Sequence, residues 1–148
     1  MRIDETGKSL NSDEICNELE QSLAGVMEGT VSKEEFLKTF LTSNLYILLD
    51  GEPVGGVLGD RVPMVFAPSA ESERMIAVFS SPMRTAAMTA KFAEYQFPVM
   101  VDTAWVLNHV GPTTGIALNP GCALGFEMAS SGAQQLKRAL DASSELNN

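Results

Sequence analysis

The chain has 148 residues, and its hydrophobic (45%) and charged (20%) fractions are ordinary for a globular protein, which excludes disorder over most of its length. Domains of this size bury roughly 68–70% of the surface that the unfolded chain exposes, so one domain with a sizeable core is expected. The 19 acidic and 10 basic residues give a formal net charge of −9. This charge repels nucleic-acid phosphates and anionic membrane surfaces, so we expect no nucleic-acid and no membrane partner.

The two cysteines, Cys16 and Cys122, lie far apart and form neither a CxxC pair nor a metal-ligand spacing. The first residues lack the apolar segment of a signal peptide, and no run approaches the ~18 apolar residues that indicate a membrane span. We therefore expect free thiols, a cytoplasmic location, and no metal or other cofactor.

The first part of the chain is predicted to be helical. Residues 1–11 are polar and are expected to be frayed. Residues 12–27 form the first predicted helix, because apolar residues recur there at helical spacing, at Ile15, Leu19, Leu23 and Val26. Gly29 is expected to end it. Ser32-Lys-Glu-Glu35 is a capping box and predicts a second helix, which buries Phe36 and Phe40 and ends near residue 43.

Short apolar runs predict strands in the middle of the chain, at residues 45–49, 62–66, 75–79 and 98–101. Pro63 lacks an amide hydrogen and therefore indicates an edge or the start of a strand. Ser81-Pro82 is expected to cap a helix to about residue 95. The residues of this helix that we expect to be buried are Met83, Ala86, Ala87 and Ala90.

Asp102 or Thr103 is expected to cap a short helix, and Gly111-Pro112 to stop it. Gly115-Ile-Ala-Leu-Asn-Pro-Gly121 is interpreted as a buried strand and a turn, followed by a second strand through Met128. Ser130 or Ser131 is expected to cap a last helix that ends near residue 142, and residues 143–148 are expected to be a flexible tail. The alternation of strands and helices from residue 75 favours parallel pairing with right-handed crossovers.

The expected fold class is therefore α/β, of mixed α+β type. We expect one mixed β-sheet of about five to six strands with helices packed on it, in a single domain over residues 12–142.

Two motifs carry a resemblance to a known family. Phe79-Ser-Ser-Pro82 opens a helix, and Gly115-Ile-Ala-Leu-Asn-Pro-Gly121 precedes a capped last helix. Over roughly residues 32–142 this pattern resembles the SseB N-terminal domain family, the enhanced serine sensitivity protein-like family. The resemblance implies a bacterial cytosolic α/β domain that acts as an interaction or regulatory module. It supplies no catalytic residues, and longer members of the family carry a second domain.

Candidates for chemistry are few. Cys122 could act as a nucleophile only beside a base, and the single histidine, His109, has no spacing that indicates such a pair. That histidine also lacks the partners of a zinc site. The glycine-rich residues 55–59 lack the pattern of a phosphate-binding loop. Asp50 and Asp60 are interpreted as turn and loop residues.

The best binding candidates are Asn119, Pro120 and Gly121, with Asp102 and Arg61, because ligands of α/β sheets bind at strand ends. The sequence nevertheless favours a non-enzymatic protein-interaction or regulatory domain, whose partner is another protein or a second copy in a homodimer. One alternative is a small-molecule binder or an enzyme of unknown class at the strand ends near Asn119. A further alternative is an acidic protein similar to a type III secretion chaperone.

Overall fold

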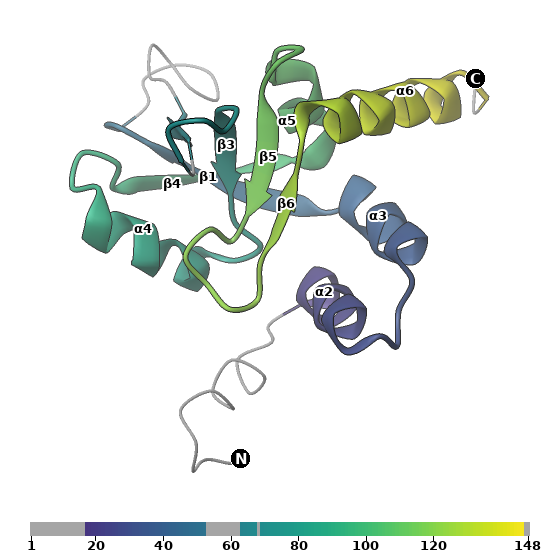
Figure 1. Ribbon diagram of the computed structural model, residues 1–148, viewed down its shortest axis with the longest axis horizontal. Coiled ribbons are helices and arrows are strands. Elements are labelled where there is room, and N and C mark those ends of the chain that lie inside the picture. The colour runs from purple at the N-terminus through teal and green to yellow at the C-terminus, as the bar shows by residue number, and fades with distance from the viewer. Residues whose placement is uncertain (1–16, 53–62, 68, 147–148) are drawn as a thin grey trace.

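The computed structural model describes residues 17–52, 63–67 and 69–146. Its elements are shown in Figure 1. In chain order they are α2 (Glu18–Glu28), α3 (Lys33–Leu41), β1 (Asn44–Leu49), β2 (Val65–Phe66), β3 (Met75–Val78), the 3-10 helix η1 (Pro82–Thr85), α4 (Ala86–Lys91), β4 (Phe97–Asp102), α5 (Thr103–His109), β5 (Gly115–Leu118), β6 (Phe126–Met128) and α6 (Ser130–Leu146). The expected mixed class of helices and strands is confirmed.

The strands form two ladders in place of the single sheet that we expected. One ladder is the antiparallel pair β1–β4, and the other has the order β2-β3-β5-β6. The predicted parallel pairing is present between β3 and β5, but it was wrong for β4, which pairs antiparallel with β1. The pairs β2–β3 and β5–β6 are antiparallel. The ladders meet where Tyr46 and Phe79 exchange two backbone hydrogen bonds of 2.8 Å. Strand β5 occupies one edge of β3. On the other edge, β2 pairs with the first half of β3 and Tyr46 of β1 pairs with Phe79 just after its end, so β1 does not join the four-stranded ladder along its whole length.

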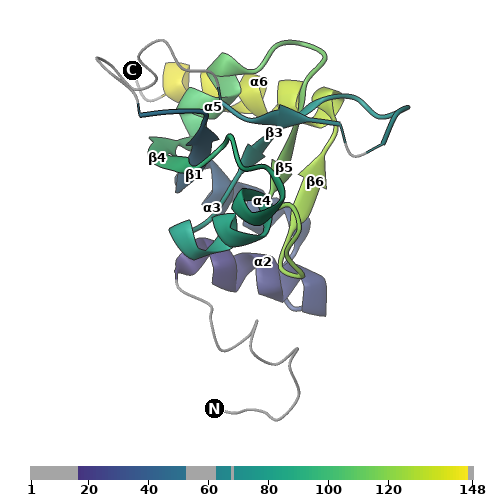
Figure 2. The same ribbon diagram turned by 90° about the vertical axis from the view of Figure 1, so that its left-hand side faces the viewer.

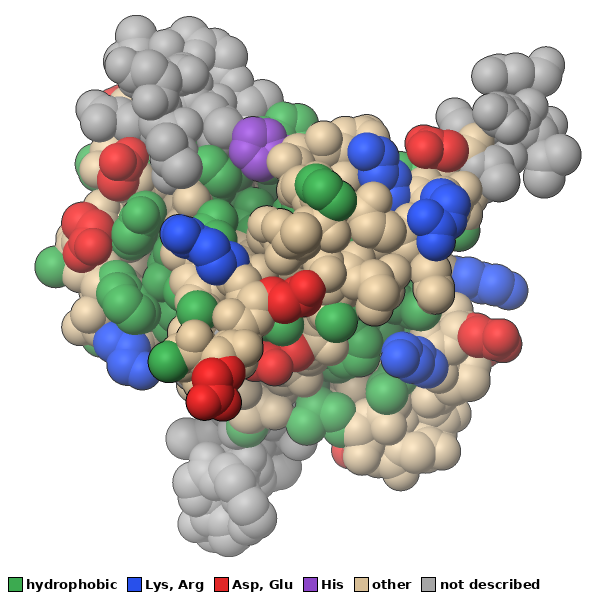
Figure 3. Space-filling view, turned by 45° about the horizontal axis from the view of Figure 1, so that its top comes forward, with side chains coloured by type: hydrophobic (Ala, Val, Ile, Leu, Met, Phe, Trp, Pro, Cys, Tyr) green, Lys and Arg blue, Asp and Glu red, His purple; other side chains and the backbone are tan. Residues whose placement is uncertain are grey.

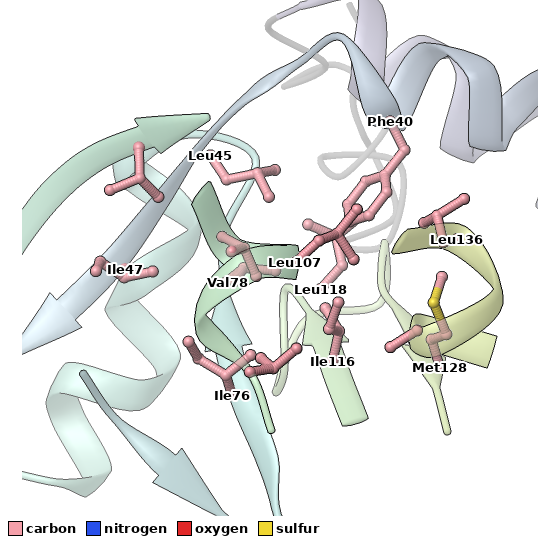
Figure 4. Close-up of a cluster of buried hydrophobic side chains, with 14 of the residues drawn as sticks. Phe40, Leu45, Ile47, Ile76, Val78, Leu107, Ile116, Leu118, Met128 and Leu136 are labelled. Carbon is pink, nitrogen blue, oxygen red and sulfur yellow. The ribbon is translucent and has the colours of Figure 1, made fainter. Parts of the chain in front are cut away.

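The two faces of these ladders carry two hydrophobic clusters. On β1, Leu45, Ile47 and Leu49 belong to the larger cluster, whereas Leu48 belongs to the smaller one. This alternation follows from the two-residue period of a strand. The larger cluster also contains apolar side chains of α2, α3, α5 and α6, and Figure 4 shows its centre. The smaller cluster includes Met88 of α4, so α4 lies on the opposite face.

Helices α2 and α3 begin and end largely where their local signals indicate. Gly29 has φ of 85° and closes α2, as predicted, and Ser32 Oγ accepts the Glu35 amide at 3.1 Å. The start of α2 differs from the prediction. Asn17 is its N-cap, with Oδ1 accepting the Glu20 amide at 2.9 Å, so residue 17 is not yet helical. Predicted helical residues 12–16 lie outside the described residues, as do the glycine-rich residues 55–59 and Val62.

The prediction for the helix after β3 was wrong in its cap, its length and its buried face. Ser81 makes no side-chain cap bond, and the segment is η1 followed by α4, which ends at Lys91. Its buried side chains include Arg84, Thr85 and Met88, whereas the four residues expected to be buried are exposed, namely Met83, Ala86, Ala87 and Ala90. The reason is that Arg84 turns inward to pair with Glu20 of α2.

The end of the chain also differs in detail from the prediction. Strand β6 starts only at Phe126, so residues 119–125 form a longer connection than the predicted turn. The capping of α6 comes from outside the local sequence: the carboxylate of Glu73 accepts both the amide of Ser130, at 2.9 Å, and its hydroxyl. Helix α6 continues to Leu146, past the expected end near residue 142.

Candidate functional site

Asn119 closes β5 and is the centre of the site that the sequence singled out. It is the one non-glycine residue with positive φ (56°) among the described residues, which agrees with its expected place in a turn. Its side chain is fully buried. Oδ1 accepts the Ser80 amide at 2.9 Å, and Nδ2 donates to Ser80 Oγ and to the Leu124 carbonyl, both at 2.9 Å. Asn119 therefore joins the end of β3 to the connection after β5.

Ser80 continues this network to α2. Its hydroxyl donates to Oε2 of Glu20, which also accepts the Ser81 hydroxyl at 3.0 Å. The Arg84 guanidinium donates from Nη2 to Glu20 Oε1 at 3.0 Å and from Nε to Oε2 at 3.2 Å. The side chains of Glu20 and Arg84 are 0% and 4% exposed. We name Glu20, Ser80, Ser81, Arg84 and Asn119 the Glu20–Arg84 cluster.

The hydrogen bonds and the ion pair of the Glu20–Arg84 cluster are suited to stabilising the fold. A buried ion pair is tolerated when its geometry is good and hydrogen bonds satisfy the remaining lone pairs, as the two serine hydroxyls do here. The Glu20 carboxylate is occupied by donors on both oxygens, which leaves it poorly placed to accept a proton from a substrate. The cluster fastens α2 to the carboxyl ends of β3 and β5, where many α/β folds bind ligands.

Cys122 and His109 do not form a nucleophile–base pair in the described part of the chain. The Cys122 thiol is half-buried and donates to the Arg84 carbonyl at 3.5 Å. Burial raises its pKa, and the nearby Glu20 carboxylate adds to this effect while Arg84 opposes it. A raised pKa leaves less of the reactive thiolate. His109 instead stacks on Trp105, with ring centroids 4.5 Å apart, and Figure 3 shows the histidine at the surface.

The other predicted site residues do not converge on Asn119. Asp102 caps α5, as expected, because its Oδ1 accepts the Trp105 amide at 2.8 Å. Arg61, like Asp60, lies outside the described residues. A shallow cleft of about 340 Å³ does gather Asn119, Pro120 and Gly121, but Asp102 is not among its lining residues.

A second cleft, of about 440 Å³, lies beside the first and shares Pro120, Gly121 and Glu127 with it. Its apolar wall is formed by Phe66, Met88 and Phe92, and its polar lining includes one cationic and one anionic side chain, Lys91 and Glu127. Such an apolar wall with a few polar groups is the usual composition of a small-molecule site.

Strand β4 presents an unusual surface at the outer end of the β1–β4 ladder. Its only partner among the described strands is β1, and Figure 2 shows it at the end of the row β4, β1, β3, β5, β6. Phe97 and Met100 are 42% and 56% exposed, and Pro98 between them is also exposed. Side chains alternate between the faces of a strand, so Phe97 lies on one face of the ladder and Pro98 and Met100 lie on the other. We name these three exposed residues together the β4 edge patch.

Sequence reasoning missed the Glu20–Arg84 cluster and the β4 edge patch. One signal for the cluster was present: Arg84 is the sole charged residue among residues 75–90, and an isolated charge in an apolar segment is often buried with a partner. Its partner could not be found locally, because Glu20 lies 64 residues earlier. The strand at residues 98–101 was predicted, but its position at an edge depends on strand order.

The described residues contain neither a metal-ligand group nor a membrane-spanning helix. These residues contain no group of three or more histidine, cysteine, aspartate or glutamate side chains placed to hold a metal ion. No helix in the same part of the chain is both long and apolar enough to cross a membrane.

Comparison with known proteins gives one match. The family model described as the SseB protein N-terminal domain matches residues 19–133. Neither the search of curated proteins nor that of solved structures returned a match. The matched range covers most of the chain and contains the whole Glu20–Arg84 cluster.

Proposed function

The chain belongs to the SseB protein N-terminal domain family, and from this premise we propose that it is a non-enzymatic domain that binds another protein. The β4 edge patch carries the proposal. Exposed apolar surface is typical of protein-interaction sites, and a chain lying along the edge of β4 would cover exposed apolar side chains on both of its faces. Here Phe97 and Met100 are exposed on a strand whose second edge has no described partner.

The polar groups at the strand ends support a binding role over catalysis. Asn119, Ser80 and Glu20 are buried and bonded to one another. Their hydrogen-bonding capacity is used to hold the fold together, so reaction chemistry would need other groups. We place the protein in the bacterial cytoplasm, where a free thiol such as that of Cys122 stays reduced.

Site-specific photo-crosslinking tests the proposal. The photoreactive residue p-benzoylphenylalanine replaces Phe97 on β4 in one variant and Gln135, an exposed residue of α6, in a control variant. Irradiation of bacterial cells should give discrete adducts with another protein from position 97 and none of these adducts from position 135. The proposal fails if position 97 gives no adducts, or if both positions give the same ones.

The second cleft supports an alternative, a small-molecule binder. Lys91 and Glu127 both line a cavity whose wall includes Phe66 and Met88. This composition suits a small ligand that has an apolar body and carries both an anionic and a cationic group. Methyl-labelled methionine NMR checks this alternative: amino acids and similar zwitterions should shift the Met88 signal and leave the exposed Met27 signal unchanged. Equal shifts at both methionines, or none, would reject it.

A homodimer, including one of the secretion-chaperone kind, makes a different prediction. Such a dimer would have to bring together two chains that each carry a formal net charge of −9. Their mutual repulsion disfavours it at low salt. Light scattering at low and at high salt distinguishes a monomer from a homodimer. We expect a monomer at both salt concentrations, and a dimer at either would favour the homodimer.

A further inference from the structure

We propose that the outer edge of β4 binds an extended, basic segment of a partner protein as an added β-strand. This inference rests on the proposed interaction function and specifies its mode and the chemistry of the partner. Addition of a strand at a sheet edge is a recurring way to bind peptides, in which backbone hydrogen bonds supply affinity and side chains supply specificity.

The register of the β1–β4 ladder shows which backbone groups point outward. The Thr103 amide donates to the Ser43 carbonyl at 3.1 Å, one residue beyond the pair Asn44–Asp102. Hydrogen-bonded and non-hydrogen-bonded pairs alternate along an antiparallel ladder. Asp102, Met100 and Pro98 are therefore in non-hydrogen-bonded positions opposite β1, and their backbone groups point to the edge of β4 that no other described strand occupies.

The hydrogen bonds on the edge of β1 that faces away from β4 confirm this alternation. Tyr46, which is opposite Met100, uses its amide and carbonyl to bond Phe79, away from β4. Leu48, which is opposite Pro98, accepts the Met64 amide with its carbonyl at 2.9 Å, again away from β4. The outer edge thus offers the amide and carbonyl of Met100, the carbonyl of Pro98 and the amide of Asp102.

Pro98 reduces the number of backbone hydrogen bonds that the outer edge of β4 can form, but it does not prevent strand addition. It has no amide hydrogen, so one donor is missing from the outward row. Proline and charged residues at sheet edges oppose uncontrolled pairing of one chain with its copies. Met100 can still form a complete two-bond pair with an incoming strand. The edge therefore suits a short segment that gains further energy from its side chains.

The charges around β4 select a basic segment. The sequence has no lysine or arginine between Lys91 and Lys137. Asp102 is exposed at one end of β4, and Glu94 is exposed just before the other end. Asp50, also exposed, directly follows Leu49, the partner of Phe97. An extended segment with apolar residues against the β4 edge patch and lysine or arginine near these carboxylates satisfies both requirements, whereas a second copy of this acidic chain does not.

A peptide-binding experiment tests the inference. The probe is a short fluorescein-labelled peptide with a valine-rich centre and lysines at both ends, and its binding to the full chain is followed by fluorescence anisotropy at low salt. Two matched peptides serve as controls. One replaces lysine with glutamate, and the other keeps the sequence but carries methyl groups on alternate backbone nitrogens. We expect the lysine peptide to bind and both controls to bind at least about tenfold more weakly.

Protein variants test the register independently. Pro98→Val restores the missing outward amide, so it should tighten binding about fivefold, the effect of one typical hydrogen bond. Met100→Pro removes an outward amide and should weaken binding by a similar factor, with circular dichroism to show that the variant is folded. Met27→Thr on α2 changes a methionine of equal exposure (56%) and should have no effect.

The inference is overturned if the methylated peptide binds as well as the unmethylated one, if Pro98→Val gives no gain, or if light scattering shows a dimer that Met100→Pro dissociates. Crosslinks from position 97 together with absent peptide binding would reject the added strand and leave the interaction function standing. Absence of both would reject the two together.

Discussion

Glu20 is the residue on which the strand ends depend most directly. Its carboxylate lies fully buried on α2 and accepts hydrogen bonds from Ser80, Ser81 and Arg84. Removal of one partner of a buried ion pair leaves an uncompensated charge, which is strongly destabilising. The pair is thus expected to matter most when only one of its members is changed.

Substitutions at both positions test this expectation. Glu20→Gln or Arg84→Met alone should lower the free energy of unfolding by about 3–5 kcal/mol. The double variant Glu20→Met/Arg84→Met should lose less than the sum of the single changes, because no charge is left without its partner. Urea denaturation measures all three. Glu18→Gln, an exposed residue of the same helix, should change stability by no more than about 1 kcal/mol. Additive losses would show that the two side chains act independently.

Asn119 combines a backbone and a side-chain role, and two substitutions separate them. Asn119→Gly keeps access to the positive φ but leaves the Ser80 amide and the Leu124 carbonyl without their side-chain partner, which should cost about 1–3 kcal/mol. Asn119→Ala should cost about 1 kcal/mol more, because alanine is strained in the left-handed region. Equal stability of the two variants in urea would mean that the backbone conformation contributes little.

Among the elements, α6 depends on a distant side chain for its start. Hydrogen bonds from the hydroxyl and the amide of Ser130 hold the pKa of Glu73 below its ordinary value. A lowered pKa in the folded state means that the ionised form stabilises the fold. That contribution is complete above the unfolded-state pKa of a glutamate and is lost as the pH falls through the lowered folded-state pKa.

Glu73→Gln should therefore lower the urea midpoint at neutral pH, and the difference from the unmodified chain should shrink as the pH is reduced below the ordinary glutamate pKa. Urea titrations at several pH values between neutrality and strong acid give this comparison. Glu71→Gln, on the same loop, is the matched control and should show a smaller effect at neutral pH. A difference that is constant with pH would contradict the role of the Glu73 charge.

Helix ends that depend on contacts between residues close together in the chain could be predicted from the sequence. Features that depend on contacts between distant residues could not. Gly29, Ser32 and Asp102 bond to groups within five residues, so their patterns indicated helix ends correctly. The Ser130 partner lies 57 residues away. The orientation of α4 was also unpredictable, since its alanines indicated a buried face while the long-range pair of Arg84 turned that face outward.

At the scale of the whole molecule, two ladders and two hydrophobic clusters are joined into one body. Tyr46 and Phe79 link the ladders through their backbones, and the Glu20–Arg84 pair links α2 to η1. The sequence indicated the fold class and the burial of Ile116 and Leu118, because these depend on composition and local period. It could not indicate the division of the sheet, which depends on which strand occupies each part of the edge of β3.

These links predict a single cooperative unfolding transition. The one tryptophan, Trp105 on α5, packs against the larger cluster, which also contains Leu23 of α2. Tryptophan fluorescence and far-ultraviolet circular dichroism should therefore give the same urea midpoint. Leu23→Ala should lower stability by about 2–5 kcal/mol and shift both midpoints together. Separate midpoints would show that parts of the molecule unfold independently.

Because the acid that neutralises Arg84 is carried by the first described helix, that helix cannot be regarded as an optional extension in front of an independent sheet. A shortened form beginning at α3 would retain every described strand, yet it would lack the carboxylate that pairs with Arg84 and accepts the hydroxyls of Ser80 and Ser81. Any attempt to define the smallest self-sufficient version of this domain should keep residues 17–28, even though all the strands come later in the chain.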